Sequence, residues 1–203
     1  MKIALATFVK TPGMSPIKTR LGQTIGTAAA LEFYVKSLAA TYETVSAVKN
    51  HFAIAPYWAV AEKQALGAIF WQKWPQIWQG EGGLGDRLAR VYTELKKQYD
   101  VVGFYGADSP HIKSEELVSA LMQIKNEETS TVVGPTEDGG FYFLASRLPV
   151  TSEVWTSVEY SQNTTLQQLL NKWPDSHVKK MNTHFDIDTD KELERLRKID
   201  QRF

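Results

Sequence analysis

Residues 101–110 read VVGFYGADSP, an apolar run that ends in small residues and a carboxylate. A short apolar run bounded by a turn signal is typical of a strand that is buried on both faces. A carboxylate just past the C-terminal end of such a strand lies where open α/β sheets place their ligands. Asp108 is therefore the first candidate for chemistry in this chain.

Segments with strand character alternate along the chain with segments of helical spacing. We expect strands or extended segments at 2–9, 51–55, 68–71, 101–105, 131–134, 141–145 and 178–187. We expect helices at 27–48, 84–99, 114–125 (with Ser114 as its cap) and 164–173, and a last helix from the capping box at 189–192. The alternation predicts an α/β fold with a mostly parallel sheet between helices, and the two late consecutive strands predict one antiparallel member.

The bulk composition limits the classes of function. With 203 residues, no repeat and no linker, we expect a single domain over 1–203. The 23 basic and 23 acidic residues cancel, so binding of nucleic acid is not expected. Cysteine is absent, which excludes disulfides and thiolate catalysis and fits a reducing compartment. No apolar segment approaches the roughly 20 residues of a membrane span, so a cytoplasmic protein is expected.

Residues 10–20, KTPGMSPIKTR, form a basic loop after the first strand. Lys10, Lys18 and Arg20 are suited to surround phosphate oxygens with point charges and a guanidinium fork. The loop matches neither the P-loop pattern nor GxGxxG, and a solvated basic loop would have the same composition.

Residues 79–87, QGEGGLGDR, form a glycine-rich loop. Its glycines allow close backbone approach to a ligand, and a helix that begins at Leu84 points amide groups at the loop. A flexible connection is the alternative, but it would not need Asp86 and Arg87 in the first helical turn.

Carboxylates suggest a metal site. Asp108 is a hard oxygen ligand for Mg²⁺ or Mn²⁺ held jointly with substrate phosphates, although an Asx turn ahead of Pro110 is the alternative. Asp186 and Asp188 point the same way in an extended segment, so one of them is a candidate second carboxylate. Electrostatics at a helix start would also explain acidic residues here.

Residues 134–140, GPTEDGG, place adjacent carboxylates between two strands. Asp138-Gly139 is also an ordinary hairpin turn signal, but such a turn does not require Glu137. The histidines show no ligand spacing, and we expect His111 to be an exposed turn residue.

Taken together and in this order, these stretches resemble a bacterial family of "selenodomain-associated" glycosyltransferase-like proteins. That family is related to the molybdopterin and phospholactate guanylyltransferases, within the nucleotide-diphospho-sugar transferase (GT-A) superfamily. The resemblance runs from about Phe8 to Leu193. Its most specific parts are KTRL (18–21), LGDR (84–87), GADSP (106–110), GPTEDGG (134–140) and DIDT (186–189).

The resemblance implies a three-layer α/β/α fold and assigns roles to the stretches. Lys10, Lys18 and Arg20 would face the nucleotide phosphates. The nucleoside would lie along Gln79, Gly82, Gly83, Leu84 and Gly85. Asp108 and Asp188 would bind Mg²⁺ or Mn²⁺. The acceptor or sugar side would be lined by Glu137, Asp138, Gly139 and Gly140.

The sequence departs from the family pattern at three positions. Ser15 stands where a glycine is usual, Gly83 replaces an aspartate, and Tyr160-Ser161 replaces Trp-Ser. These changes bear on the identity of the substrate more than on the fold.

The hypothesis is a metal-dependent transferase with a nucleotide-sugar or nucleoside triphosphate donor and a small-molecule acceptor, Asp108, Glu137 and Asp138 being the catalytic candidates. A nucleotidylyltransferase of the guanylyltransferase type needs the same metal and cationic loop. A nucleotide-binding protein without turnover is a further alternative, and a metal phosphohydrolase leaves the glycine loop without a role.

Overall fold

A seven-stranded sheet lies at the centre of the computed structural model, which describes residues 1–203. The strands follow the order β3-β2-β1-β4-β6-β5-β7, and β6 is antiparallel to both neighbours while the other pairs are parallel. The prediction of a mostly parallel sheet with an antiparallel member is confirmed. The strands are β1 (Ile3–Val9), β2 (Ile54–Val60), β3 (Gln76–Trp78), β4 (Val101–Tyr105), β5 (Thr131–Pro135), β6 (Phe141–Ser146) and β7 (Val178–Lys180).

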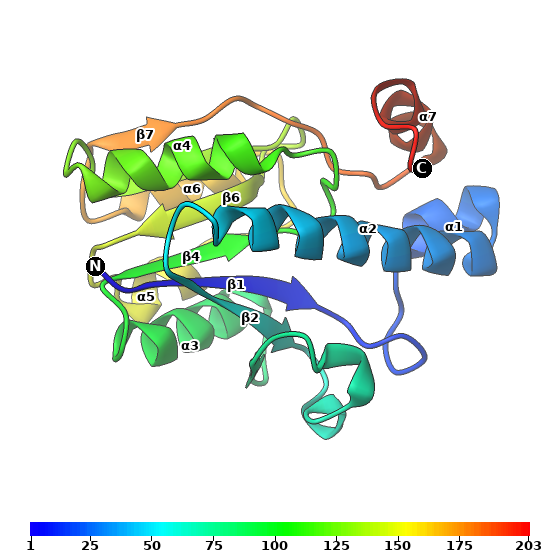
Figure 1. The fold of residues 1–203 in the computed structure, drawn as a ribbon, viewed down its shortest axis with the longest axis horizontal. Helices are drawn as coiled ribbons and strands as arrows, with labels where there is room; N and C mark the ends of the chain where they lie inside the picture. The colour runs from blue at the N-terminus through cyan, green and yellow to red at the C-terminus, as the bar shows by residue number, and fades with distance from the viewer.

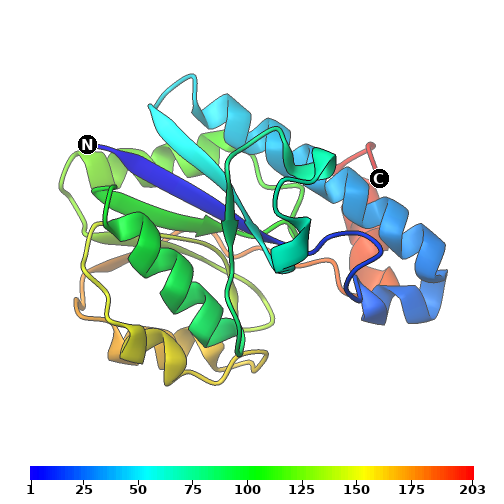
Figure 2. The same ribbon diagram turned by 90° about the horizontal axis from the view of Figure 1, so that it is seen from below.

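Helices cover both faces of the sheet, so the molecule has the three α/β/α layers that the sequence predicts (Figures 1 and 2). One face carries α2 (Thr27–Val48) and α4 (Ser114–Lys125). The opposite face carries α3 (Leu84–Lys96), α5 (Ser152–Thr156) and α6 (Thr165–Lys172). Alternate residues of each strand point to opposite layers, as Leu5 and Ala6 of β1 do.

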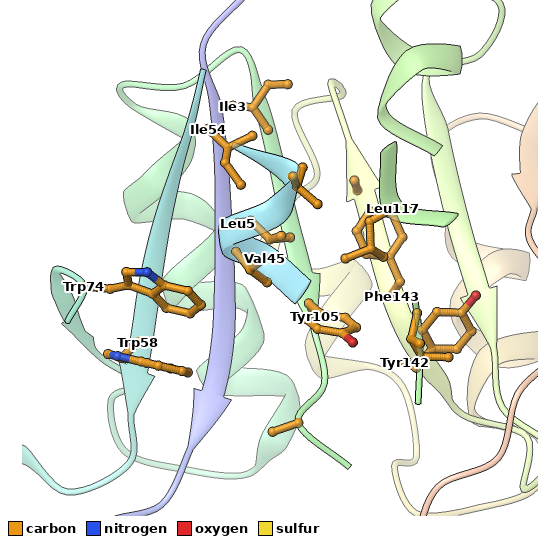
Figure 3. Close-up of a cluster of buried hydrophobic side chains, with 14 of the residues drawn as sticks. Ile3, Leu5, Val45, Ile54, Trp58, Trp74, Tyr105, Leu117, Tyr142 and Phe143 are labelled. Atoms are coloured by element: carbon orange, nitrogen blue, oxygen red, sulfur yellow. The ribbon is translucent and has the colours of Figure 1, made fainter. Parts of the chain in front are cut away.

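The core between the sheet and the α2 and α4 layer is rich in aromatic residues (Figure 3). Trp58 of β2 stacks on Trp74, with 4.1 Å between the ring centroids. Leu5 of β1 and Val45 of α2 belong to the same buried cluster. Burial of such large side chains supplies the main driving force for this packing.

A separate small core lies beyond the C-terminal ends of β1 and β4, where α1 (Thr19–Ile25) and α7 (Asp190–Ile199) meet (Figure 1). We call this cluster the terminal core. It consists of Leu21, Ala30, Phe33, Phe185, Ile187, Leu193 and Leu196. The terminal core fixes the basic loop of the N-terminal part against the segment that precedes the last helix.

Three predicted segments differ in the structure. The strand expected at 51–55 is displaced to β2, which continues through Pro56. Pairing with β3 starts only at Trp58, so the proline nitrogen faces an unpaired part of that edge and no hydrogen bond is lost. Residues 69–71 form a 3-10 turn, which buries Trp71 while Ile69 stays exposed.

The extended segment expected at 178–187 keeps strand pairing only in β7, because the chain then leaves the sheet toward α7. Ser114 does not cap α4, since Lys113 is the N-cap and no side chain bonds there. The capping box at the start of α7 is confirmed: the Thr189 N–H donates to Glu192 Oε2 at 2.8 Å. None of the helices combines the length and hydrophobicity needed to cross a lipid bilayer.

Candidate functional site

A cleft of about 710 Å³ opens at the C-terminal ends of β1 and β4. These two strands are neighbours, and the chain continues to β2 on the far side of β1. The cleft therefore lies at a point where the strand order reverses, which is the usual ligand position in open α/β sheets. We call it the strand-end cleft. The predicted site residues that line it are Lys10, Lys18, Arg20, Gln79, Leu84, Asp108, Asp138 and Asp188.

The Lys18 ammonium lies at the centre of the ionic contacts in the strand-end cleft. Its Nζ is 2.7 Å from Asp108 Oδ1 and 3.3 Å from Asp188 Oδ1, and it also donates to the Ile187 carbonyl at 2.7 Å. The Lys18 side chain is only 6% exposed, whereas the Asp108 and Asp188 side chains are 54% and 42% exposed. The two carboxylates predicted to bind metal thus converge on one buried cation.

Burial alone would lower the pKa of Lys18, but the charges of Asp108 and then Asp188 raise it above its ordinary value. The ammonium therefore stays charged over the physiological range. Arg20 adds a second cation, with its Nη1 at 3.4 Å from Asp188 Oδ2. This arrangement leaves positive charge facing the cleft beside two partly exposed carboxylates.

Asp186 lies behind this layer and not in the cleft. It accepts a hydrogen bond from the Ser109 hydroxyl. Burial, and then the charge of Asp108, raise the pKa of Asp186 to about 7. Of the two aspartates that the sequence offered as a second carboxylate, Asp188 is the one at the cleft.

The basic loop is held in a defined shape. The Tyr34 hydroxyl on α2 is 3.0 Å from both the backbone nitrogen and the carbonyl oxygen of Lys10. The Thr11 N–H donates to the Glu62 carboxylate at 2.9 Å. Lys18, the N-cap of α1, has φ 45° and ψ 47°, a left-handed conformation that is uncommon for a residue with a Cβ. Backbone strain of this kind often accompanies a functional position.

In the glycine loop, Gly82 and Gly83 are exposed, whereas Gln79 is buried and supports the neighbouring strand ends. The Gln79 amide nitrogen donates to the carbonyls of Val9 and Ala59 at 3.1 and 2.8 Å. Its Oε1 accepts from Arg87 Nη1 at 3.3 Å, so Gln79 joins the strand ends to a cleft cation.

Gly82, Gly83 and Gly85 do not line the cleft. The Gly83 N–H donates to Asp86 Oδ2 at 2.9 Å, which caps α3. A Cβ added at Gly85 would lie 2.6 Å from the Trp155 carbonyl oxygen, so this glycine lets α3 pack against α5. Leu84 is the member of this group that lies at the cleft.

The acidic loop places its two carboxylates in different surroundings. Asp138 lines the cleft and accepts from the Thr136 hydroxyl at 2.5 Å and from the Gly140 N–H at 3.0 Å. Glu137 is outside the cleft and forms a two-point ion pair with Arg195 at 2.7 and 2.8 Å. The hydrogen bonds from Arg195, and then its charge, hold the pKa of Glu137 below its usual value.

Gly139 and Gly140 are not cleft-lining residues either. Gly139 has φ 90°, and a Cβ there would lie 2.0 Å from the Asn163 carbonyl oxygen. The glycine therefore lets the acidic loop rest directly on Asn163, which does line the cleft.

The cleft-lining residues to which sequence reasoning gave no role include Tyr34, Arg87, Ser161, Gln162 and Asn163. Arg87 stood out in the sequence as a charge in the first turn of a helix, without an assigned role. Ser161 has φ 60°, another left-handed residue with a side chain, and it belongs to the Tyr160-Ser161 departure. That departure was the one signal that pointed to this wall of the cleft.

A second cavity of about 590 Å³ lies beside the start of α4, and we call it the histidine cavity. His111 stacks on Phe185 at 4.4 Å between ring centroids, and both of its ring nitrogens are buried without a partner. Burial, followed by the charges of His184 and Arg195, lowers the pKa of His111 to about 4. The expectation of an exposed turn histidine was wrong, because the ring packs into this wall.

The chemistry of the donors fits a hard divalent cation. Three oxygens converge on one point, which the Lys18 ammonium occupies. They belong to Asp108, Asp188 and the Ile187 carbonyl. No group of three or more acidic, histidine or cysteine side chains surrounds a metal position. A cation held here would therefore depend on substrate phosphates to complete its shell, as Mg²⁺ commonly does.

The fold is similar to those of solved transferases. A protein from Desulfovibrio desulfuricans G20, provisionally described as a nucleotide-diphospho-sugar transferase, shares 20% identity with a TM-score of 0.80, over 92% of this chain and 82% of that one. The 4-diphosphocytidyl-2C-methyl-D-erythritol synthase of Anaerococcus prevotii DSM 20548 shares 15% identity with a TM-score of 0.62, over 95% and 93% of the two chains.

The Mycobacterium tuberculosis glucosyl-3-phosphoglycerate synthase, solved with Mn²⁺, UDP and glucosyl-3-phosphoglycerate, shares 12% identity with a TM-score of 0.56. That match covers 96% of this chain and 74% of that one. At these identities the likeness establishes the fold.

No curated protein matches the sequence. A family model does match: residues 38–162, more than half of the chain, fit the family described as an uncharacterized protein conserved in bacteria, DUF2064. This segment holds β4 with Asp108 and the acidic loop with Asp138. The chain, with its nucleotide-diphospho-sugar transferase fold, is therefore a member of the DUF2064 family.

Proposed function

We propose that this chain is a metal-dependent transferase of the selenodomain-associated glycosyltransferase-like kind, with a nucleotide-sugar or nucleoside triphosphate as donor. The observation that carries the proposal is the charge arrangement of the strand-end cleft. Four cationic side chains and three carboxylates line it at the sheet's ligand position. A pyrophosphate group needs this combination of cations for its oxygens and carboxylates for a shared metal.

The cations are the groups that bind and orient the phosphates. Lys10, Lys18 and Arg20 reach the cleft from one loop, and Arg87 reaches it from the first turn of α3. Charges held in place by the surrounding structure stabilise negative charge that develops on a leaving phosphate without a cost of reorganisation. Gln79 keeps Arg87 in position through its own bonds to the ends of β1 and β2.

Asp108 and Asp188 are the residues that would hold Mg²⁺ or Mn²⁺. Such a cation supplies charge neutralisation and a template for the phosphate oxygens when it is bound. The likeness to a transferase solved with Mn²⁺ and UDP supports this choice of cofactor.

Asp138 is the best candidate for orienting or deprotonating the acceptor. Its carboxylate lies at the cleft and is fixed by Thr136 and Gly140, next to the wall formed by residues 161–163. A general base in such a position contributes about 10²–10⁴-fold to a transfer reaction. Glu137 is engaged with Arg195 and has no such access.

Nucleotidylyl transfer is the second candidate, since the fold is also similar to a diphosphocytidyl transferase. The two reactions differ in the leaving group. Glycosyl transfer releases a nucleoside diphosphate, and nucleotidylyl transfer releases pyrophosphate from a nucleoside triphosphate.

Thermal-shift measurements with nucleoside diphosphates, nucleoside triphosphates and nucleotide sugars, each with and without Mn²⁺, test the proposal. A true donor raises the melting temperature by mass action, and more strongly with Mn²⁺. Asp108→Asn should abolish the Mn²⁺-dependent part of the shift. Equal shifts in both proteins, or no shift with any nucleotide, would remove the basis of the proposal.

The product then separates the candidate reactions. Incubation of the identified donor with a panel of small hydroxylated or phosphorylated acceptors should release either nucleoside diphosphate or pyrophosphate. Binding without release of either product, whatever the acceptor, would instead support a nucleotide-binding protein without turnover.

A further inference from the structure

Lys18 is held more tightly than a phosphate-binding lysine requires. Its ammonium contacts three oxygens, its side chain is 6% exposed, and its backbone is in a left-handed conformation. Lys10, in the same loop, makes a single side-chain bond, to the Pro16 carbonyl at 3.2 Å. This difference in side-chain contacts indicates that Lys18 has a role in the ligand-free protein.

We propose that Lys18 is the resident cation of Asp108 and Asp188, and that it must leave these carboxylates for a divalent metal to bind. The inference rests on the proposed function, in which the two carboxylates hold the metal. In the nucleotide-free protein, Lys18 keeps the carboxylates at one point and weakens their affinity for a metal on its own. Metal and nucleotide therefore favour each other's binding.

The geometry makes the two cations exclusive. The ammonium lies 2.7 Å from Asp108 Oδ1 and 3.3 Å from Asp188 Oδ1, so it occupies the space between the two carboxylates that a shared metal would use. A metal at this point would stand within bonding distance of the ammonium, where like charges repel strongly. One cation must move, and the flexible four-carbon stem of lysine allows it to be Lys18.

The nucleotide gives the displaced ammonium a new partner. Lys18, Lys10 and Arg20 line the same cleft, so phosphate oxygens held by Lys10 and Arg20 lie within reach of the Lys18 side chain. The exchange keeps the charges paired, because the metal binds the carboxylates while the ammonium binds the phosphates. The positive charge of Lys18 therefore has negatively charged partners both before and after the exchange.

Mn²⁺ binding without nucleotide tests the exchange directly. Free Mn²⁺ is measured by electron paramagnetic resonance during titration of the wild type, Lys18→Met and Lys18→Arg. Methionine keeps the buried stem and removes the charge, so the affinity of Lys18→Met for Mn²⁺ should rise about tenfold or more. Lys18→Arg keeps the charge and should stay close to the wild type.

Lys10→Met is the matched control, because Lys10 lines the cleft without contacting Asp108 or Asp188. Its Mn²⁺ affinity should change by less than about threefold, since a more distant charge is screened. Adding Asp108→Asn to Lys18→Met should remove the gain. An unchanged affinity in folded Lys18→Met, or tight binding of Mn²⁺ by the wild type alone, would overturn the proposal.

A measurement on the wild type keeps the test valid if Lys18→Met does not fold. Reductive methylation followed by mass spectrometry reports how accessible each lysine amine is. Saturating Mn²⁺ should increase the labelling of Lys18 severalfold and leave Lys10 unchanged. Labelling of Lys18 that is constant or reduced in Mn²⁺ would contradict the exchange. Neither experiment contains nucleotide. A failure of the proposed exchange is therefore distinguishable from a failure of the proposed function, which the thermal-shift measurements with nucleotides report.

Discussion

Glu137 and Asp138 are adjacent in the sequence, but their carboxylates contact different parts of the molecule. Glu137 binds Arg195 of α7 through two hydrogen bonds of 2.7 and 2.8 Å. Asp138 lines the strand-end cleft, where the Gly140 N–H donates to it at 3.0 Å. Glu137 thus connects the acidic loop to the last helix, and Asp138 supplies a carboxylate to the cleft.

Alanine substitutions should separate these two roles. Glu137→Ala removes an exposed ion pair, so the free energy of unfolding should fall by less than about 1 kcal/mol with activity nearly unchanged. Asp138→Ala should lower kcat/KM about 10²-fold or more, since the proposed acceptor base is lost. Steady-state kinetics with the identified donor and urea unfolding measure the two effects. Equal activity losses in both variants would contradict the assignment.

Two helical glycines should respond to alanine in opposite ways. A Cβ at Gly85 of α3 would lie 2.6 Å from the Trp155 carbonyl oxygen, so Gly85→Ala should cost about 1–3 kcal/mol. A Cβ at Gly22 of α1 meets nothing nearer than 3.6 Å, so Gly22→Ala should be neutral or stabilising by up to about 1 kcal/mol. Urea unfolding of both variants measures the difference, and a neutral Gly85→Ala would show that α5 can move aside.

Lys10 should contribute to nucleotide affinity in a salt-dependent manner. Lys10→Met removes a cleft cation with little other bonding, so the affinity for the identified nucleotide should fall about tenfold. The variant should also lose less affinity than the wild type as ionic strength rises. Isothermal titration calorimetry checks both effects. Lys36→Met is the control, because Lys36 pairs with Glu32 on α2 and lies outside the cleft.

His111 should make the folded protein sensitive to acid. The unfolded chain takes up a proton at His111 near pH 6.5, whereas burial and neighbouring cations lower the folded pKa to about 4. The unfolded state therefore binds more protons in this interval, and stability is lost as the pH falls through it. His111→Phe keeps the stacking on Phe185, and its free energy of unfolding should fall less steeply between these pH values. Parallel slopes for the two proteins would contradict this account.

Much of the fold could be predicted from local sequence signals. The apolar run 101–105 coincides with β4, and the capping box at Thr189 starts α7 as expected. These features depend on residues close together in the chain. Pro56 was misleading because its effect on a strand depends on whether a neighbour needs its missing N–H, and here β3 begins two residues too late to do so.

The candidate site could be predicted in its parts but not in its contacts. The sequence indicated Lys18, Asp108 and Asp188 separately, whereas their convergence depends on the terminal core and on Ile187, whose N–H donates to the Asp108 carbonyl at 3.0 Å. Gln79, Gly82, Gly83 and Gly85 were expected at the nucleoside. Gln79 does line the cleft but also bonds to two strand ends, and Gly85 packs closely against α5. No local pattern distinguishes a glycine that faces a ligand from one that faces another helix.

The bond between Lys18 and Asp188 joins residues 170 positions apart. During translation, all seven strands leave the ribosome before the second carboxylate, that of Asp188. The basic loop must therefore wait, with its lysine unpaired on one side, until the segment that carries α7 emerges and the terminal core closes. A nascent chain that stalled before this point would have nearly the full architecture and no completed cleft, so that the capacity to act on a ligand arises only with the last stretch of synthesis.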